Sequence, residues 1–176
     1  MTIEKKYKDY RPGKKWFKII YSKIVFFVLG KALKGLSKFD EDARNELKPL
    51  KEGFIVKFEV APFGPSMALQ KKKGILEYMG QKNVDKLKED MSFIFRNIEP
   101  AFEMLSAQKG FPKIYSENSV GTIGDPSYSM IFYRISNLVQ FYLWPKIIAK
   151  IVLKEVPEMT IKKFITRIKI YLSIFI

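Results

Sequence analysis

The acidic side chains closest to a catalytic grouping are Glu117 and Asp125, which lie near Tyr115 in the chain. Two carboxyl groups that share a pocket can serve as general acid and general base. Asp125, however, directly precedes Pro126, and this pair is typical of a helix start with Asp as the N-cap. We favour the helix start. The competing hypothesis is an enzyme, and substitution of Asp125 and Glu117 would support it if turnover were lost while stability stayed unchanged.

A second acidic group, Asp40-Glu41-Asp42, offers the oxygen ligands that calcium and magnesium prefer. The same residues suit the N-cap and first turn of a helix, where negative charge is favourable, and we favour that interpretation. Val120 to Gly124 contains two glycines, but the following Asp125 would repel a phosphate. We therefore expect no metal site and no phosphate-binding loop.

The sequence contains neither cysteine nor histidine. This absence excludes disulfides, thiol nucleophiles, a histidine general base and every metal site built from histidine or cysteine ligands. Carboxylates, lysine, tyrosine and serine remain, but no catalytic arrangement of them stands out. The sequence accordingly predicts a protein without catalytic residues and without a cofactor.

The positive charge is concentrated at the two ends of the chain. Of the net charge of +14, residues 1–36 carry +8 and residues 145–176 carry +5, which leaves +1 for the middle. A basic surface attracts nucleic acid or anionic lipid, and a plain compositional bias toward lysine is the alternative. Arginine is scarce and no nucleic-acid recognition motif occurs, so we do not expect nucleic acid as a partner.

Apolar periodicity predicts helices at both ends of the chain and short strands between them. The first helix should follow a basic arm, and its apolar stripe runs through Phe17, Ile20, Tyr21, Ile24, Phe27 and Val28. The fold class is α+β, a mostly antiparallel five-stranded sheet covered by helices, with amphipathic helices at the N- and C-termini. Helices are predicted over 14–36, 41–48, 98–108, 126–144, 146–156 and 160–176; Asn97 should cap the third of these, and residues 109–112 should end it. Strands are predicted over 54–61, 66–72, 75–79, 91–95 and 116–123, the first three as an antiparallel meander.

The two most apolar terminal stretches are short. Residues 19–29 are interrupted by Lys23, and residues 170–176 form a run of seven. A membrane-spanning helix needs about 20 apolar residues, and no signal-peptide cleavage pattern follows the first stretch. We expect a cytoplasmic protein that can bind peripherally to a membrane.

The order of these segments resembles the sterol carrier protein 2-like (SCP2-like) family. The resemblance lies in the polar-to-apolar strand over 88–95, the helix over 101–105, and Ile123-Gly124-Asp125 followed by an apolar helix. It covers roughly residues 36–145 and implies an apolar tunnel, between sheet and helices, that holds acyl chains or sterols without catalysis. The family's small-residue stretch is replaced here by bulkier, more polar residues at 113–118, which bears on pocket size.

The resemblance divides the chain into a basic arm and amphipathic helix at 1–36, an SCP2-like lipid-binding domain at 37–145, and a helical extension at 146–176. The expected function is non-catalytic binding of a lipid, acyl chain or sterol-like ligand, with transfer and docking to anionic membrane as further expectations. The alternative is a structural or partner-binding protein that uses its apolar helices as a protein interface. The expected pocket residues are Phe93, Phe95, Phe102, Leu105, Met130, Ile131, Ile135 and Val139; the expected membrane contacts are Lys14, Lys15, Lys18, Lys162, Lys163 and Arg167.

Overall fold

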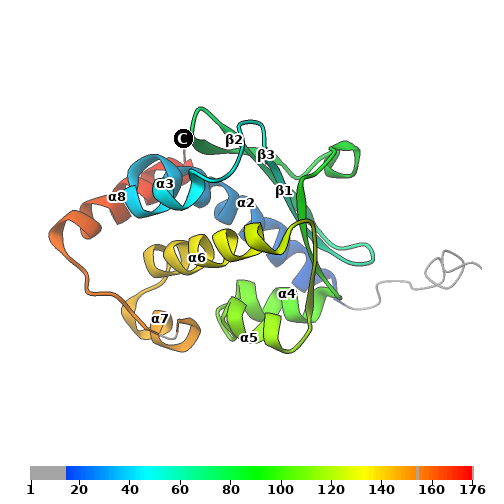
Figure 1. Ribbon diagram of the computed structural model, residues 1–176. Helices are drawn as coiled ribbons and strands as arrows, with labels where there is room; N and C mark the ends of the chain where they lie inside the picture. The colour runs from blue at the N-terminus through cyan, green and yellow to red at the C-terminus, as the bar shows by residue number, and fades with distance from the viewer. Residues whose placement is uncertain (1–14, 154, 176) are drawn as a thin grey trace, which may run out of the picture.

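The computed structural model describes residues 15–153 and 155–175 and places a curved sheet along one side of the helices (Figure 1). The predicted arm and Lys14 lie outside the described residues. The helices are α2 (Trp16–Phe39), α3 (Glu41–Leu47), α4 (Ile98–Leu105), α5 (Phe111–Ser116), α6 (Pro126–Leu143), α7 (Lys146–Val152) and α8 (Ile161–Phe175). The strands are β1 (Ile55–Val60), β2 (Ser66–Lys72), β3 (Ile75–Gly80), β4 (Met91–Phe95) and β5 (Val120–Ile123).

The five strands form one sheet in the order β3-β2-β1-β4-β5. All neighbouring strands are antiparallel except β1 and β4, which pair in parallel with Phe58 opposite Phe93. The first three strands form the predicted meander, and the predicted α+β class with a mostly antiparallel five-stranded sheet is confirmed. The parallel pair arises because the chain crosses from the edge strand β3 back to the other side of β1.

One face of the sheet carries the apolar core. Val56, Phe58 and Val60 alternate along β1 with Lys57 and Glu59, so their side chains point to the helices. The other face is partly covered by the β3–β4 connection, in which Val84 is buried within the short 3₁₀ helix η1 (Val84–Lys86). Lys57 is buried on that face and pairs with Glu89, their charged atoms 2.7 Å apart.

The three predicted N-caps are confirmed. Asp40 accepts a hydrogen bond from the Ala43 N–H at 2.9 Å, Asn97 from the Glu99 N–H, and Asp125 from the Ser127 N–H. Each side-chain oxygen satisfies a backbone donor that the first helical turn leaves without an intrahelical partner. These caps fix the beginnings of α3, α4 and α6.

The segment after α4 differs from the prediction. Residues 109–112 were expected only to end a helix, but Phe111 and Pro112 begin α5, because proline is tolerated in the first turn. As a consequence β5 starts at Val120 rather than at residue 116. Helix α7 ends at Val152, four residues before the predicted end, and α2 continues to Phe39, three residues beyond its predicted end.

Helix α2 is the central element of the helical layer. The Ser37 hydroxyl accepts a hydrogen bond from the Leu76 N–H of β3 at 3.0 Å, and Gly30 lies against the ring of Tyr78. On another side, Gly35 lets α8 approach so closely that a Cβ atom there would collide with Ser173. Helix α2 thus packs on both the sheet and α8, and it crosses the predicted boundary between residues 36 and 37.

Candidate ligand cavity

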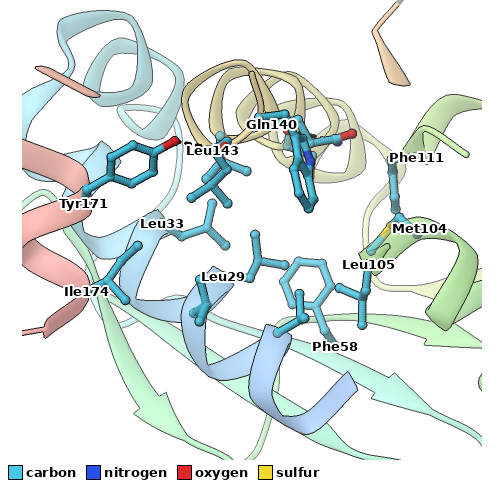
Figure 2. Close-up of a pocket in the computed structure, with 15 residues that line it drawn as sticks. Leu29, Leu33, Phe58, Met104, Leu105, Phe111, Gln140, Leu143, Tyr171 and Ile174 are labelled. Atoms are coloured by element: carbon cyan, nitrogen blue, oxygen red, sulfur yellow. Dashed lines mark hydrogen bonds between the residues drawn. The ribbon is translucent and has the colours of Figure 1, made fainter. Parts of the chain in front are cut away.

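A cavity of about 280 Å³ lies between α2, the sheet, α4, α5, α6 and α8. Its lining is almost entirely apolar, and Figure 2 shows the side chains of these elements converging on one space. The lining residues are Val25, Val28, Leu29, Leu33, Phe58, Met104, Leu105, Phe111, Ser136, Val139, Gln140, Leu143, Trp144, Tyr171 and Ile174.

The spacing along two helices explains why they form walls of the cavity. On α6, residues 136, 139, 140 and 143 follow steps of three and four and therefore share one helix face. On α2, residues 25, 29 and 33 follow steps of four, with Val28 beside them. The N-cap at Asp125 and the break before Pro145 set the ends of α6.

The polar groups at the cavity wall are few, and one of them, the Gln140 side-chain oxygen, is buried without a hydrogen-bond partner among the described residues. The Gln140 amide donates to the Ser136 carbonyl at 3.1 Å, and the Tyr171 hydroxyl donates to the Leu143 carbonyl at 2.9 Å. The described lining includes no aspartate, glutamate, lysine or arginine. Such a wall favours an apolar chain or ring system over a charged ligand, because an unpaired charge is costly to bury.

Helix α8 closes one side of the cavity and is attached to the end of α6. The Arg167 guanidinium donates to the Phe141 carbonyl at 2.6 Å and to the Trp144 carbonyl at 3.1 Å. Carbonyls at a helix C-terminus lack intrahelical partners, so a cation there is favourable. Arg167, which the sequence predicted as a membrane contact, therefore joins α8 to α6.

A second hollow, of about 480 Å³, lies on the other side of α6 against α3, α5 and the chain after α7. Its lining includes Asp42, Glu46, Arg134 and Glu155, and Arg134 pairs with Glu46 at 2.6 Å. Although this hollow is the larger one, its charged wall makes it a less suitable site for an apolar ligand.

Two of the eight predicted pocket residues, Leu105 and Val139, line the cavity. Phe93, Phe95, Ile131 and Ile135 are buried in the core beside it, and the Phe102 ring packs against Tyr21. Met130 is 53 % exposed. Ligand contact by these eight residues stays a prediction.

The prediction did not include the cavity residues on α2 and α8. The stripe identified in the sequence runs through Phe17, Ile20, Tyr21, Ile24, Phe27 and Val28. Four of these residues are exposed, Tyr21 is half-buried, and Val28 alone lines the cavity. A second series at steps of four, Val25, Leu29 and Leu33, was the available signal for the wall of the cavity.

The acidic candidates have structural partners. Glu117 pairs with Lys109 at 2.9 Å, and Asp125 caps α6, where the Ser127 N–H holds the pKa of its carboxyl below the ordinary value. Asp40 caps α3 and also accepts a hydrogen bond from the Tyr142 hydroxyl at 2.6 Å. In the part of the chain that the structure describes, no three acidic residues gather in a way that could hold a metal ion.

The described residues among the expected membrane contacts also have partners within the protein. Lys15 and Lys18 both pair with Glu99, Lys162 pairs with Glu41 at 2.8 Å, and the Lys163 ammonium lies over the Phe141 ring. Lys14 lies outside the described residues. Across residues 15–153 and 155–175, none of the helices combines the length and the apolar character needed to cross a bilayer.

Comparison with known proteins gives matches only at the level of structure. No family model matches the sequence, and no curated protein matches it. One similar solved structure is a UbiJ-SCP2 ubiquinone synthesis protein, 15 % identical, covering 70 % of this chain and 98 % of that chain with a TM-score of 0.43.

Two further similar structures are sterol carrier proteins. Sterol carrier protein 2 from Yarrowia lipolytica is 15 % identical, with coverage of 65 % of this chain and 88 % of that chain and a TM-score of 0.45. The sterol carrier protein domain 2 of Helicoverpa armigera is 16 % identical, with coverage of 72 % and 91 % and a TM-score of 0.46. These are SCP2 domains, the family that the sequence resembles.

Proposed function

We propose that this protein binds a lipid, an acyl chain or a sterol-like ligand, without catalysis, in the cavity between α2, α4, α6 and α8. The observation that carries this proposal is the apolar lining of a cavity of about 280 Å³, to which five helices and one strand contribute. An apolar wall of this extent is unfavourable in contact with water, and an apolar ligand in the cavity would cover it. The sequence resemblance implies the same class of ligand.

The expected driving force is burial of apolar surface. Each methylene group that moves from water into the cavity contributes about 0.8 kcal/mol. A chain of several methylene groups can therefore bind without any charged contact at the wall. Transfer of the ligand between membranes is a further part of the proposal.

Native mass spectrometry of freshly purified protein, with solvent extraction of any bound species, tests ligand binding. We expect a bound fatty acid, phospholipid or sterol-like mass, or its appearance after incubation with mixed lipids. A mass of the protein alone under both conditions would contradict the proposal.

A cavity-filling variant tests the location. Leu29 lines the cavity from α2, and Leu29→Trp should reduce binding of a fluorescent fatty acid by at least tenfold. Leu138→Trp is the matched control, because Leu138 is also a partly buried helical leucine but faces the second hollow. Equal affinities of the two variants would place the ligand elsewhere.

The second part of the proposal is docking to anionic membrane, which would bring the cavity to a source of ligand. Basic residues at both ends of the chain support it, because cationic side chains near an anionic bilayer gain about 1 kcal/mol each. Vesicle flotation with anionic and neutral lipids tests this part; equal binding to both, or to neither, would contradict it. A cytoplasmic location also stays a prediction.

A protein interface is the second candidate function. Exposed apolar side chains on α7 and α8, such as Ile147 and Phe164, are the observation that favours it. A homodimer or captured partner that covers these side chains, together with an empty cavity in native mass spectrometry, would favour this function over ligand binding.

A further inference from the structure

Helix α8 packs against the protein with its less apolar side. Thr166 and Ile170 are its buried residues, and Ser173 lies against Gly35 of α2. Most of the larger apolar residues of α8 are exposed and follow steps of three and four, which places them on one face; Ile170 and Ile174 lie on the inner side. The exposed apolar residues are Ile161, Phe164, Ile165, Ile168, Tyr171, Leu172 and Phe175, and this set is called the α8 stripe below.

A basic groove of about 370 Å³ runs along the contact between α2 and α8. Lysines 31, 34 and 38 line it from α2, and Lys169 lines it from α8 together with Leu172 of the α8 stripe. Lys34 pairs with Glu77 at 2.8 Å, whereas lysines 31, 38 and 169 form no ion pair with a described carboxylate. The groove therefore holds three ammonium groups without a carboxylate counter-charge among the described residues. Each lies over a phenylalanine ring, Lys31 over Phe27 and both Lys38 and Lys169 over Phe39.

The face of α2 that carries these lysines is apolar farther toward its N-terminus. Ile20, Ile24 and Phe27 precede Lys31, Lys34 and Lys38 at alternating steps of four and three, so all six share one face. The three apolar residues are about half exposed. The groove thus joins two exposed apolar faces, one on α2 and one on α8.

We propose that the α8 stripe and the basic groove together form the surface that docks on an anionic phospholipid bilayer. Lysines 31, 38 and 169 bind lipid phosphates, and the α8 stripe enters the boundary between head groups and acyl chains. This inference rests on the docking part of the proposed function. It assigns docking to residues other than the six that the sequence predicted, three of which, Lys15, Lys18 and Lys162, form ion pairs with carboxylates of the protein.

Charge favours a bilayer over a second copy of the chain as the occupant of this surface. A symmetric contact would bring the same lysine-rich groove of two molecules together, and like charges repel across an interface. A bilayer that contains phosphatidylserine supplies the opposite charge and an apolar layer at once. The docked face also adjoins the cavity, because α2 and α8 contribute Val28 and Ile174 to its wall.

Sedimentation of the full chain with vesicles tests the groove. The vesicles contain phosphatidylcholine alone or with about 30 % phosphatidylserine. A groove variant combines Lys31→Gln, Lys38→Gln and Lys169→Gln. Its partition coefficient between solution and the anionic vesicles should be at least tenfold lower than that of the wild type. The matched control combines Lys72→Gln, Lys82→Gln and Lys113→Gln, which remove three exposed lysines from other parts of the protein and lose the same net charge.

The α8 stripe has its own variant and control. Phe164→Gln with Ile168→Gln should weaken anionic-vesicle binding by at least tenfold, and the loss should persist at high salt, because salt does not screen apolar insertion. Ile147→Gln with Ile151→Gln is the control on α7, where both isoleucines are more than half exposed. All four positions are at the surface, so the variants should fold, and circular dichroism checks this.

The outcomes separate this inference from the proposed function. If wild-type protein does not bind anionic vesicles, both the docking part of the proposed function and this docking surface are refuted. If wild-type protein binds but groove and control variants lose equal affinity, this surface is refuted while docking stands. The docking surface would also be refuted if the wild-type protein is a dimer, the α8 stripe variant is a monomer, and both bind vesicles equally. That result would indicate that the α8 stripe is a protein interface. Fatty-acid uptake without vesicles measures the ligand-binding part independently.

Discussion

The hydrogen bond between Tyr142 and Asp40 should be among the most costly single contacts to remove. The Tyr142 hydroxyl lies 2.6 Å from the Asp40 carboxylate, and both residues are buried. The bond connects α6, which supplies much of the cavity wall, to the junction of α2 and α3. Its loss should therefore loosen the cavity as well as the fold.

The expected loss follows from two separate roles of Asp40. Tyr142→Phe removes a hydrogen bond to a charged acceptor, which is worth about 1.5–3 kcal/mol. Asp40→Ala also removes the cap on the Ala43 N–H, worth about 1 kcal/mol, and leaves the buried tyrosine hydroxyl without an acceptor. Asp40→Asn keeps the cap and should cost less than Asp40→Ala.

Thermal and urea unfolding of the three variants measure these losses. For a chain of this size, each kcal/mol shifts Tm by about 2–4 °C, so Tyr142→Phe should lower Tm by roughly 3–12 °C. Tyr133→Phe is the control, because Tyr133 is a half-buried tyrosine of the same helix whose hydroxyl has no hydrogen bond to a described residue. Equal Tm values for Tyr142→Phe and Tyr133→Phe would refute the reasoning.

Three further predictions concern acid stability, a close contact and the ligand. Lys57 holds the pKa of Glu89 below its ordinary value of 4.5, so the stability from this pair is present above pH 4.5 and is lost as pH falls through the lowered pKa. Glu89→Gln should flatten that part of an acid titration of stability, and an unchanged profile would exclude this role. Gly110→Ala should destabilise the protein by more than about 1 kcal/mol, because the new methyl group would collide with the Val152 carbonyl, whereas Gly121→Ala, where space is open, should cost less. In a series of fatty acids, each pair of added methylene groups should tighten Kd by about tenfold until the cavity is full, and a Kd independent of chain length would indicate surface binding.

Local patterns of the sequence were sufficient for most of the secondary structure. The sequence predicted strands over 54–61 and 91–95, where the structure has β1 and β4, and Asp40, Asn97 and Asp125 predicted three helix starts. These features depend on residues that are neighbours in the chain, so the sequence displays them directly. Helix α5 was missed because Gly110 and Pro112 also suit a helix end, and only the following turn separates the two cases.

The cavity could be predicted only in part. Leu105 and Val139 lie on the predicted apolar faces of their helices, but Phe93 and Phe95 pack into the core rather than against the open space. A sequence indicates that a side chain is buried but does not indicate whether its neighbours fill the space around it. That depends on how α2, α6 and α8 meet.

The sequence by itself determined that α2 and α8 are amphipathic, that the ends are basic, and that histidine and cysteine chemistry is absent. Only the tertiary structure decided which side of each helix faces inward. Gly35 and Ser173 allow a close contact between α2 and α8, so the side of α8 that carries Ser173 is buried and most of the large apolar residues of α8 are left outside. Close packing is set by the shapes of two surfaces that meet, and neither helix's own pattern contains the shape of its partner.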